Sequence, residues 1–380
     1  MTAGPFFALV ALLVWSYLLL GRGLFWVPRI AKLAPAPKDW PRVTAIVPAR
    51  DEAATVGAAV TSLLKQDYPG AFSIVLVDDQ SSDGTAQIAR DAAAALGMAG
   101  RLRVVAARPL PDGWSGKLWA LSEGVRAAND SGAPGLYLFT DADIAHHPRN
   151  LAELVARVAT GYDLVSLMVK LHCRSLAERF MIPAFVYFFA MVYPFAWSND
   201  PRKRIAAAAG GCVLMQRAAF ERIGGFEAVK GELIDDCALA RAVKRGGRIW
   251  LGFTRETRSL RAYPSLATIW NMVARTAYAQ LGYSVLNLLV TVVALGVTFL
   301  APIFVLPVGG FATVLALVAW VAMSVSYVPM LRFYGVSVLS ATLLPAVATV
   351  YLAATVVSAW RHWRGRGGEW KGRVSWHSRP

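Results

Sequence analysis

The stretch Val75-Leu76-Val77-Asp78-Asp79-Gln80-Ser81-Ser82-Asp83-Gly84-Thr85 is an apolar run that ends in two carboxylates and a polar turn. The run predicts a buried strand over Ile74–Val77, and the pattern after it predicts a helix over Thr85–Leu96. Ser82 and Asp83 are ordinary capping and turn residues for such a helix. Capping does not explain why the strand should end in paired acids, so this turn is a candidate ligand site.

The same alternation of short apolar strands and helical patterns continues on both sides of this stretch. It predicts an α/β domain over residues 38–261, Rossmann-like and with a mostly parallel sheet, whose ligands bind at the carboxyl ends of the strands. The remaining predicted strands are Val43–Val47, Arg103–Val105, Leu136–Phe139, Leu164–Leu167 and Ile249–Leu251, and the remaining helices are Ala53–Lys65, Leu118–Ala128 and Leu151–Ala159.

The composition is too apolar for an ordinary soluble domain, because 56% of the 380 residues are hydrophobic and the mean hydropathy is +0.45. The net charge is +15, but the basic residues flank apolar segments and form no basic helix interleaved with aromatics, which argues against nucleic-acid binding. The three cysteines have no CxxC spacing. This pattern favours a reducing compartment and argues against a zinc site.

Four apolar segments are long enough to cross a bilayer. Residues 1–30 predict an N-terminal transmembrane helix; a cleaved signal peptide is the weaker alternative, because no basic region precedes the apolar run. Residues 285–360 predict about three more transmembrane helices, followed by a basic tail over 361–380. Three C-terminal crossings would place this tail across the membrane from the catalytic domain, against the positive-inside rule. One of these segments is therefore either re-entrant or crosses twice.

The aromatic-rich segment 176–198 lies inside the α/β domain. A single crossing there would separate acidic motifs that we expect to share a site, so we predict an interfacial segment, with a buried core helix as the alternative. Residues 262–284 predict a second interfacial helix.

Two further motifs place polar residues at strand ends. Ile46-Val47-Pro48-Ala49-Arg50-Asp51-Glu52 runs from a strand through a polar turn into a helix, a natural site for a nucleotide. Leu138-Phe139-Thr140-Asp141-Ala142-Asp143 places acids at i and i+2, which can hold Mg²⁺ or Mn²⁺ with positions left for diphosphate oxygens. A surface turn is the alternative for the second motif. At the end of the Val75–Val77 run, Asp79 is our candidate to accept the imide N–H of a uracil base.

The last acidic motif is Gly231-Glu232-Leu233-Ile234-Asp235-Asp236-Cys237-Ala238-Leu239, which opens a helix running to about Arg245. Acids in a first helical turn are favoured by the helix dipole alone. The functional interpretation is that Asp235 or Asp236 is the general base of an inverting transfer, which needs one base and no protein nucleophile.

In this order and at these separations, VPARDE, VDDQSSDGT, DAD and IDDCAL resemble the motifs of family 2 glycosyltransferases, whose nucleotide-sugar-binding α/β domain is called GT-A. The resemblance implies that Ala49, Asp51 and Asp79 line the nucleoside pocket. It makes Asp143 the main metal ligand, with Asp141 near the donor sugar or diphosphate. Asp236 falls where the family has its catalytic base, and Asp235 stands in the place usually held by Glu.

Other positions complete the predicted donor site. Trp114-Ser115-Gly116-Lys117 is similar to a Gly-Lys element of related members, so Lys117 is predicted to meet the donor, with an exposed loop lysine as the alternative. Arg50, Glu52 and Gly211 are also assigned to donor binding. Processive polysaccharide synthases of the family carry QxxRW, of which this chain keeps only Arg275. We expect Arg275 to neutralise the diphosphate leaving group, and the missing Gln and Trp argue against a polymer channel.

The whole chain is similar to the ceramide glucosyltransferase type and, more closely, to glycosyltransferases associated with hopanoid biosynthesis, including the tail Glu369-Trp370-Lys371-Gly372-Arg373. These resemblances imply a metal-dependent inverting transfer from a nucleotide sugar, a UDP-sugar, to a hydroxyl of a membrane lipid such as a hopanoid. We expect a multi-pass protein of a bacterial-type inner membrane, with its catalytic domain in the cytoplasm.

Three alternatives stay open at this point. The first is a polyprenyl-phosphate sugar transferase or another polysaccharide-related family 2 enzyme. The second is a nucleotidyltransferase, against which the late acid pair counts. The third is an inactive lipid-binding or transport protein, which the lack of charges in the terminal spans disfavours. The sequence leaves the sugar, the acceptor and the oligomeric state undetermined.

Overall fold

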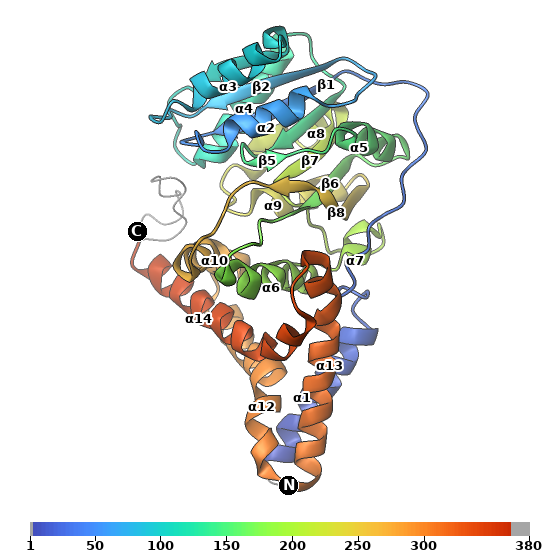
Figure 1. Ribbon diagram of the computed structural model, residues 1–380, viewed down its shortest axis with the longest axis vertical. Coiled ribbons are helices and arrows are strands. Elements are labelled where there is room, and N and C mark those ends of the chain that lie inside the picture. Colours follow the sequence, from blue (N-terminus) through green and yellow to red (C-terminus); the bar gives the residue numbers. More distant parts are fainter. Residues whose placement is uncertain (1–2, 366–380) are drawn as a thin grey trace.

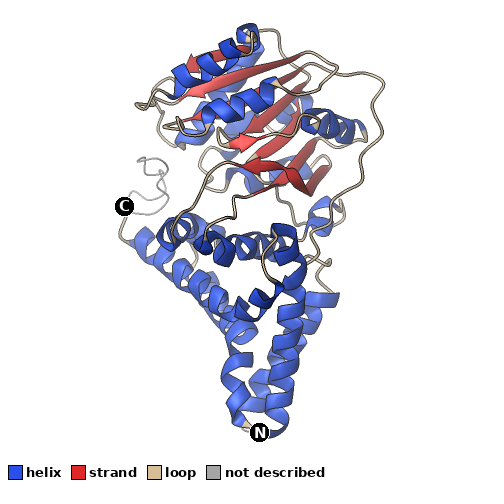
Figure 2. Ribbon diagram, viewed as in Figure 1, coloured by secondary structure: helices blue, strands red, loops and turns tan. Residues whose placement is uncertain are grey.

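The computed structural model describes residues 3–365. Its two parts are a sheet domain, residues 38–261, and a set of apolar helices that narrows away from the sheet (Figure 1, Figure 2). The predicted tail motif from Glu369 to Arg373 lies outside the described residues.

The sheet domain is built on one mixed sheet, which has eight strands within residues 3–365, in the order β3-β2-β1-β4-β7-β6-β8-β5. The pairs β1–β2, β1–β4, β2–β3 and β6–β8 are parallel, whereas β7 runs antiparallel to β4 and β6, and β5 to β8. All six predicted strands are present, and β5 and β7 were not predicted. The strands are β1 Val43–Ala49, β2 Phe72–Asp78, β3 Leu102–Ala106, β4 Leu136–Thr140, β5 Ile144–Ala145, β6 Leu164–Lys170, β7 Cys212–Gln216 and β8 Ile249–Ser259.

Helices cover both faces of the sheet, because alternate side chains of a strand point to opposite faces. Ile46 of β1 packs with residues of α4, whereas Val43 and Val47 pack with residues of α2 on the other face. The helices of this domain are α2 Val56–Leu64, α3 Thr85–Ala95, α4 Gly116–Asp130, α5 Asn150–Ala159, α7 Phe195–Asn199, α8 Arg217–Arg222 and α9 Asp235–Lys244, with short 3-10 turns η1 Ala99–Arg101 and η2 Gly225–Val229.

Four apolar segments of the described chain are long enough to span a membrane: Ala3–Leu20, Val285–Val308, Gly310–Tyr334 and Val338–Trp363. The first is α1, and the second contains α11 Val285–Leu295, a π-helical turn η3 Gly296–Leu300, α12 Ala301–Val305 and η4 Leu306–Val308. The third is α13 Gly310–Tyr334, and the fourth contains η5 Val338–Leu343 and α14 Leu344–Trp363.

Two helices, α6 Leu176–Val192 and α10 Leu266–Gln280, lie between the sheet domain and the apolar helices (Figure 1). The buried Tyr187 hydroxyl of α6 lies 2.7 Å from Ser326 Oγ of α13. From α14, Tyr351 donates a 2.9 Å hydrogen bond to the Met181 carbonyl of α6. The apolar helices are therefore joined to the sheet domain through α6.

The chain reverses direction after α13 and runs back along this helix. Near the end of α13, the Tyr334 hydroxyl accepts a hydrogen bond from the Leu171 amide of the sheet domain. The chain then returns to the middle of α13, where Trp320 Nε1 donates to the Thr342 carbonyl at 3.2 Å. From there α14 runs obliquely to α10, and Arg361 donates to Asn271 Oδ1 at 3.0 Å (Figure 1). The end of α14 thus lies on the same side of the apolar helices as the end of α13.

Close packing of α4 on the sheet gives a testable consequence at Gly124. A Cβ atom there would lie 2.3 Å from Ile46 Cγ2 and 3.0 Å from Val77 Cγ2. We expect Gly124→Ala to destabilise the protein by about 1–3 kcal/mol through overpacking, as measured by unfolding of the detergent-solubilised protein. Gly100→Ala is the control, since a Cβ at Gly100 meets nothing within 4 Å. Equal stability of the two variants would contradict the tight α4 packing.

Candidate active site

Residues from three separate motifs meet in one small cavity at the carboxyl end of β4. Its lining includes Lys117 from the first turn of α4, Asp141 from the turn after β4, and Asp235 and Asp236 from the first turn of α9. These residues are far apart in the sequence, and the fold brings them together as the predicted catalytic site requires.

Lys117 is held by the start of α4, which Ser115 caps by accepting a hydrogen bond from the Leu118 amide. Its Nζ lies 2.8 Å from Asp141 Oδ1. Burial disfavours the charge on Lys117, but Asp141, Asp235 and Asp236 outweigh this effect and raise its pKa. Lys117 therefore stays protonated and compensates the carboxylates around it.

Asp236 has the environment of a carboxylate that can accept a proton near neutral pH. Its Oδ2 accepts a 2.8 Å hydrogen bond from the Gly210 amide, and its Oδ1 accepts one of 2.7 Å from the Cys237 amide. Loss of hydration and the neighbouring Asp235 raise the pKa of Asp236 to about 6, despite the opposing effects of Lys117 and the two amides. A pKa in this range suits a general base.

Gly210 lies beside this carboxylate, whereas the next residue, Gly211, has different neighbours. A Cβ on Gly210 would lie 3.3 Å from both Asp236 Oδ2 and Lys117 Nζ, so Gly210 leaves room for the pair to approach. A Cβ on Gly211 would instead face Ile144 and Val169, while the Gly211 carbonyl accepts a hydrogen bond from Thr140 Oγ1. Gly210 was missed by the sequence reasoning, and donor binding by Gly211 stays a prediction.

The loops after β1 and β2 form one interlocked unit. The Asp51 amide donates to Ser81 Oγ at 3.0 Å, and Asp51 Oδ1 accepts from the Ser82 amide at 2.9 Å. The Glu52 amide donates to Thr85 Oγ1 at 2.8 Å. Asp51 adopts a left-handed backbone with φ of +50°, a conformation uncommon for residues other than glycine. The two motifs that predicted a nucleotide site therefore fold as a single surface.

Asp79 lies beneath this surface with a relative exposure of 1%. Its amide donates to the Ala49 carbonyl at 2.8 Å. Arg50 Nη1 donates to the Asp79 carbonyl at 2.6 Å and lies 3.6 Å from Asp79 Oδ2. The structure thus brings Ala49, Arg50 and Asp79 together, and the contact of Asp79 with a base stays a prediction.

Asp143, the predicted metal ligand, is bridged to Glu52 by an arginine that the sequence reasoning missed. Arg261 follows β8; its Nε donates to Asp143 Oδ2 at 2.6 Å and its Nη2 to Glu52 Oε1 at 2.6 Å. Burial and Asp141 raise the pKa of Asp143, and Arg261 opposes them. The signal for Arg261 in the sequence is a basic residue just beyond a strand end, at the predicted boundary of the domain.

The residues present fit a divalent cation that is shared with a phosphorylated ligand. Within residues 3–365, no three His, Cys, Asp or Glu side chains are grouped as a complete metal site. Asp141 and Asp143 nevertheless belong to the same turn, and they lie close enough together for Asp141 to raise the pKa of Asp143. Mg²⁺ typically takes one or two carboxylates and completes its shell with phosphate oxygens and water. A cation here would replace the guanidinium of Arg261 as the partner of Asp143.

The sequence from residue 41 to 279, more than half of the chain, matches the family described as glycosyltransferase like family 2. The chain belongs to this family. The predicted enzyme class is thereby confirmed, and the third alternative, a protein without transferase activity, is set aside. No curated protein sequence matches the chain.

Several solved structures are similar to this glycosyltransferase at low sequence identity. A mannosyltransferase from Pyrobaculum calidifontis, solved with GDP-Man and Mn²⁺, is 19% identical with a TM-score of 0.55, covering 94% of this chain and 98% of its own. Mannosyl-3-phosphoglycerate synthase from Rubrobacter xylanophilus is 20% identical, with a TM-score of 0.41 and coverage of 64% and 74%. Glucosyl-3-phosphoglycerate synthase from M. tuberculosis is 18% identical, with a TM-score of 0.40 and coverage of 64% and 80%. The first likeness, together with the family match, confirms the GT-A fold, and the apolar helices at both ends are those of the structure itself.

Arg275 of this family 2 chain lies on α10 with an exposed side chain. Among the described residues it forms no ion pair with the carboxylates of the site. Its predicted contact with the diphosphate leaving group stays a prediction.

A buried carboxylate on α6 fixes the loop that carries Arg261. Glu178 Oε2 accepts 2.8 Å hydrogen bonds from the amides of Arg174 and Ser175, and Oε1 accepts one of 2.6 Å from the Tyr263 amide. His172 Nδ1 lies 2.7 Å from the same Oε1. Burial opposes the charge of Glu178, but the hydrogen bonds outweigh it and lower its pKa to about 2.

This lowered pKa predicts a pH-dependent stability. Because the value in the unfolded chain is about 4.3, the contribution of Glu178 is complete above that pH and is lost as the pH falls through about 2. In Glu178→Gln the side-chain N–H₂ group would face two N–H donors, so we expect the free energy of unfolding to fall by about 2–3 kcal/mol at pH 7. Unfolding of the detergent-solubilised protein measures this difference, which should shrink below pH 4. Glu221→Gln, in an exposed pair with Arg217, is the control, and a pH-independent gap would contradict the assignment.

Proposed function

We propose that this glycosyltransferase moves a sugar from a UDP-sugar donor onto a hydroxyl of a membrane lipid, with inversion at the anomeric carbon. The observation that carries the proposal is the meeting of Lys117, Asp141 and Asp236 in one cavity, where Asp236 has a raised pKa and Lys117 remains charged. One base beside one cation is the arrangement that a single displacement at a sugar needs.

The proposed step uses Asp236 as the base. Its carboxylate takes the proton from the acceptor hydroxyl, whose oxygen forms a bond to the anomeric carbon from the side opposite the diphosphate. The bond from that carbon to the diphosphate oxygen breaks, and the nucleoside diphosphate leaves with the electron pair. Lys117 lies where it can stabilise the negative charge that develops on the leaving group.

We include Mg²⁺ or Mn²⁺ in this proposal, with Asp143 and Asp141 as its protein ligands. The support is the carboxylate pair described above and the Mn²⁺ in the similar mannosyltransferase from Pyrobaculum calidifontis. A bound divalent cation would supply electrostatic stabilisation of the diphosphate. Arg261, released from Asp143, would remain beside the donor through its contact with Glu52.

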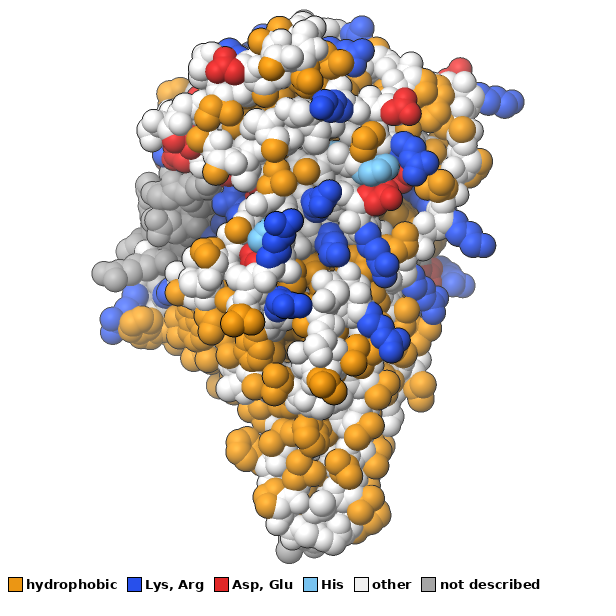
Figure 3. All heavy atoms as spheres, viewed as in Figure 1, with side chains coloured by type: hydrophobic (Ala, Val, Ile, Leu, Met, Phe, Trp, Pro, Cys, Tyr) orange, Lys and Arg blue, Asp and Glu red, His pale blue; other side chains and the backbone are white. Residues whose placement is uncertain are grey.

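A membrane lipid is the acceptor class that the architecture favours. The candidate site lies above α6 and α10, which join the sheet domain to the apolar helices. In Figure 3, Lys and Arg side chains gather just above the apolar lower part of the molecule. Cations at this level are typical of the cytoplasmic side of a bilayer. We therefore place the sheet domain in the cytoplasm of a cell with an inner membrane.

A hopanoid acceptor is the narrower form of the proposal and rests on the resemblance of the whole chain. The competing acceptor is a polyprenyl phosphate. Mass spectrometry of the lipid products, after the purified protein meets nucleotide sugars and membrane lipids, separates a glycosylated hydroxyl from a glycosylated phosphate.

The proposed role of Asp236 predicts that its replacement abolishes sugar transfer and leaves donor binding intact. We expect Asp236→Asn to lower transfer by about a thousandfold or more, since general base catalysis is lost, while UDP-sugar binding measured by calorimetry is retained. The wild-type rate should fall about tenfold per pH unit below the pKa of about 6 and level off above it. Asp91→Asn, on the exposed face of α3, is the control. Equal loss of binding and transfer would reject the assignment.

We also propose that α1, the Val285–Val308 segment and α13 cross the membrane, whereas η5 and α14 form a re-entrant hairpin. The support is the contact of Trp320 with Thr342 halfway along α13, and the return of Arg361 to α10. The basic tail then begins on the same side as the sheet domain, which removes the conflict with the positive-inside rule.

This topology is tested with an impermeant maleimide on oriented vesicles. Single cysteines are placed at Arg364 and Val308, with Cys173 replaced by serine and a cysteine at Arg101 marking the sheet domain. We expect the Arg364 and Arg101 positions to be labelled from one side, and Val308 from the other. Labelling of Arg364 together with Val308 would show that α14 crosses.

A further inference from the structure

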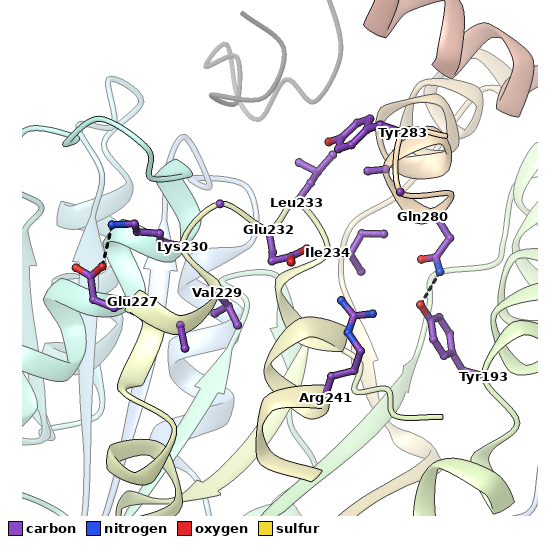
Figure 4. A pocket seen from close by; sticks show the side chains of 14 residues that line it. Tyr193, Glu227, Val229, Lys230, Glu232, Leu233, Ile234, Arg241, Gln280 and Tyr283 are labelled. Carbon is purple, nitrogen blue, oxygen red and sulfur yellow. Dashed lines mark hydrogen bonds and ion pairs between the residues drawn. The ribbon is translucent and has the colours of Figure 1, made fainter. Parts of the chain in front are cut away.

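A second, larger cavity of about 450 Å³ lies beside the candidate active site. One wall is the loop from Glu227 to Ile234, which leads directly into the catalytic turn of α9. The other wall comes from the membrane-proximal helices, with Tyr193 at the end of α6 and Gln280 at the end of α10 (Figure 4). The proposed function does not account for this cavity.

Aromatic residues place this cavity at the level where the chain enters the apolar helices. Tyr283, in its lining, directly precedes the N-cap of α11. Its ring stacks on His362 at 4.4 Å between centroids, and Tyr278 contacts both His362 and Trp363. Clusters of Tyr and Trp are typical of the headgroup level of a bilayer. A lipid that enters from the bilayer would therefore bring its headgroup to this cavity.

Polar groups line the side of the cavity that borders α9, the helix that begins with Asp235 and Asp236. Gln280 Nε2 donates a hydrogen bond to the Tyr193 hydroxyl. Burial raises the pKa of Tyr193 to about 12, and the charges of Arg241 and Asp236 both act on it. Tyr193 lines the cavity together with Ile234 and Arg241, which flank the first turn of α9 in the sequence. A headgroup in the cavity is therefore bound next to the turn that carries Asp236.

The charges in the cavity favour an uncharged ligand. Lys230 Nζ lies 3.1 Å from Glu227 Oε2, so these two compensate each other. Glu232 and Arg241 add one charge of each sign. The guanidinium of Arg241 points into the space between Glu232 and Gln280 (Figure 4). The neighbouring Asp235 and Asp236 would repel an anion. Carboxylate, amide, phenol and guanidinium groups together offer both acceptors and donors to hydroxyls.

We propose that this cavity binds the headgroup of the acceptor lipid, and that the headgroup is uncharged and bears hydroxyl groups. Gln280 and Arg241 determine its specificity, and its apolar chain lies along the exposed side chains at the start of α11, Leu286 and Leu289. This inference rests on the proposed function, since it assigns the acceptor of that same reaction.

The first test fills the cavity. Ala279→Trp should lower transfer to lipid by about tenfold or more, whereas slow hydrolysis of the UDP-sugar and its affinity should change less than about twofold, because the donor site is separate. Ala267→Trp, on the exposed first turn of the same helix α10, is the matched control and should leave all three unchanged. Gln280→Ala should raise the KM for lipid without raising that for donor. Unchanged lipid transfer in both cavity variants would overturn the assignment.

The second test needs no catalysis, so it distinguishes failure of this inference from failure of the proposed function. Ala228→Cys, at an exposed position of the cavity lining, is labelled with an environment-sensitive fluorophore in a protein whose Cys173 is serine, and the labelled protein is placed in phosphatidylcholine nanodiscs. Diacylglycerol and glucosyl-diacylglycerol serve as uncharged hydroxylated probes, and phosphatidic acid with the same acyl chains serves as the anionic probe. We expect a saturable shift with at least one uncharged probe, abolished by Gln280→Ala.

A shift with phosphatidic acid alone, lost in Arg241→Ala, would replace the uncharged headgroup by a phosphate and overturn the proposal. No shift with any probe would also overturn it. A shift with an uncharged probe in a protein that transfers no sugar would support the lipid site and reject the proposed function.

Discussion

Two cations, Lys117 and Arg261, compensate the carboxylates that crowd one edge of the sheet. Four motifs deliver acids to this edge, because β1, β2 and β4 end there and α9 begins there. Burial and like charges raise the pKa of both Asp143 and Asp236, and Arg261 and Lys117 respectively oppose this rise. The two cations therefore favour the ionised forms of the carboxylates at this edge.

The second constraint is that the position of Arg261 depends on the helices that lie between the sheet domain and the apolar helices. Arg261 stands two residues before Tyr263, whose amide is bound by Glu178 of α6. The same helix is packed by α13 and α14 through Tyr187 and Met181. The Asp143 side of the site thus depends on packing against the apolar helices, and the two parts form one structure.

The sequence predicted the elements with strong local patterns and missed those that depend on distant contacts. The six predicted strands are apolar runs bounded by turns, whereas β5 has two residues and β7 follows an alanine-rich stretch that has no strand period. Acids after a strand end predicted Asp141 and Asp143 as site residues, and an acid pair at the start of a helix, together with the family resemblance, predicted Asp236. Gly210 and Arg261 were not found, because their roles arise from backbone approach and from a side chain that reaches across two loops.

The narrowing of the apolar helices away from the sheet has a consequence for the bilayer itself. Near the sheet domain α6, α10 and the end of α14 lie side by side with the crossing helices, while the far end holds α1 and the turn between α12 and α13 (Figure 1). With the crossings proposed above, a molecule of this shape would occupy more lateral area in one leaflet than in the other. It therefore fits best where the membrane bulges toward the side of the sheet domain, and lipids with small headgroups fill the space around its narrow end.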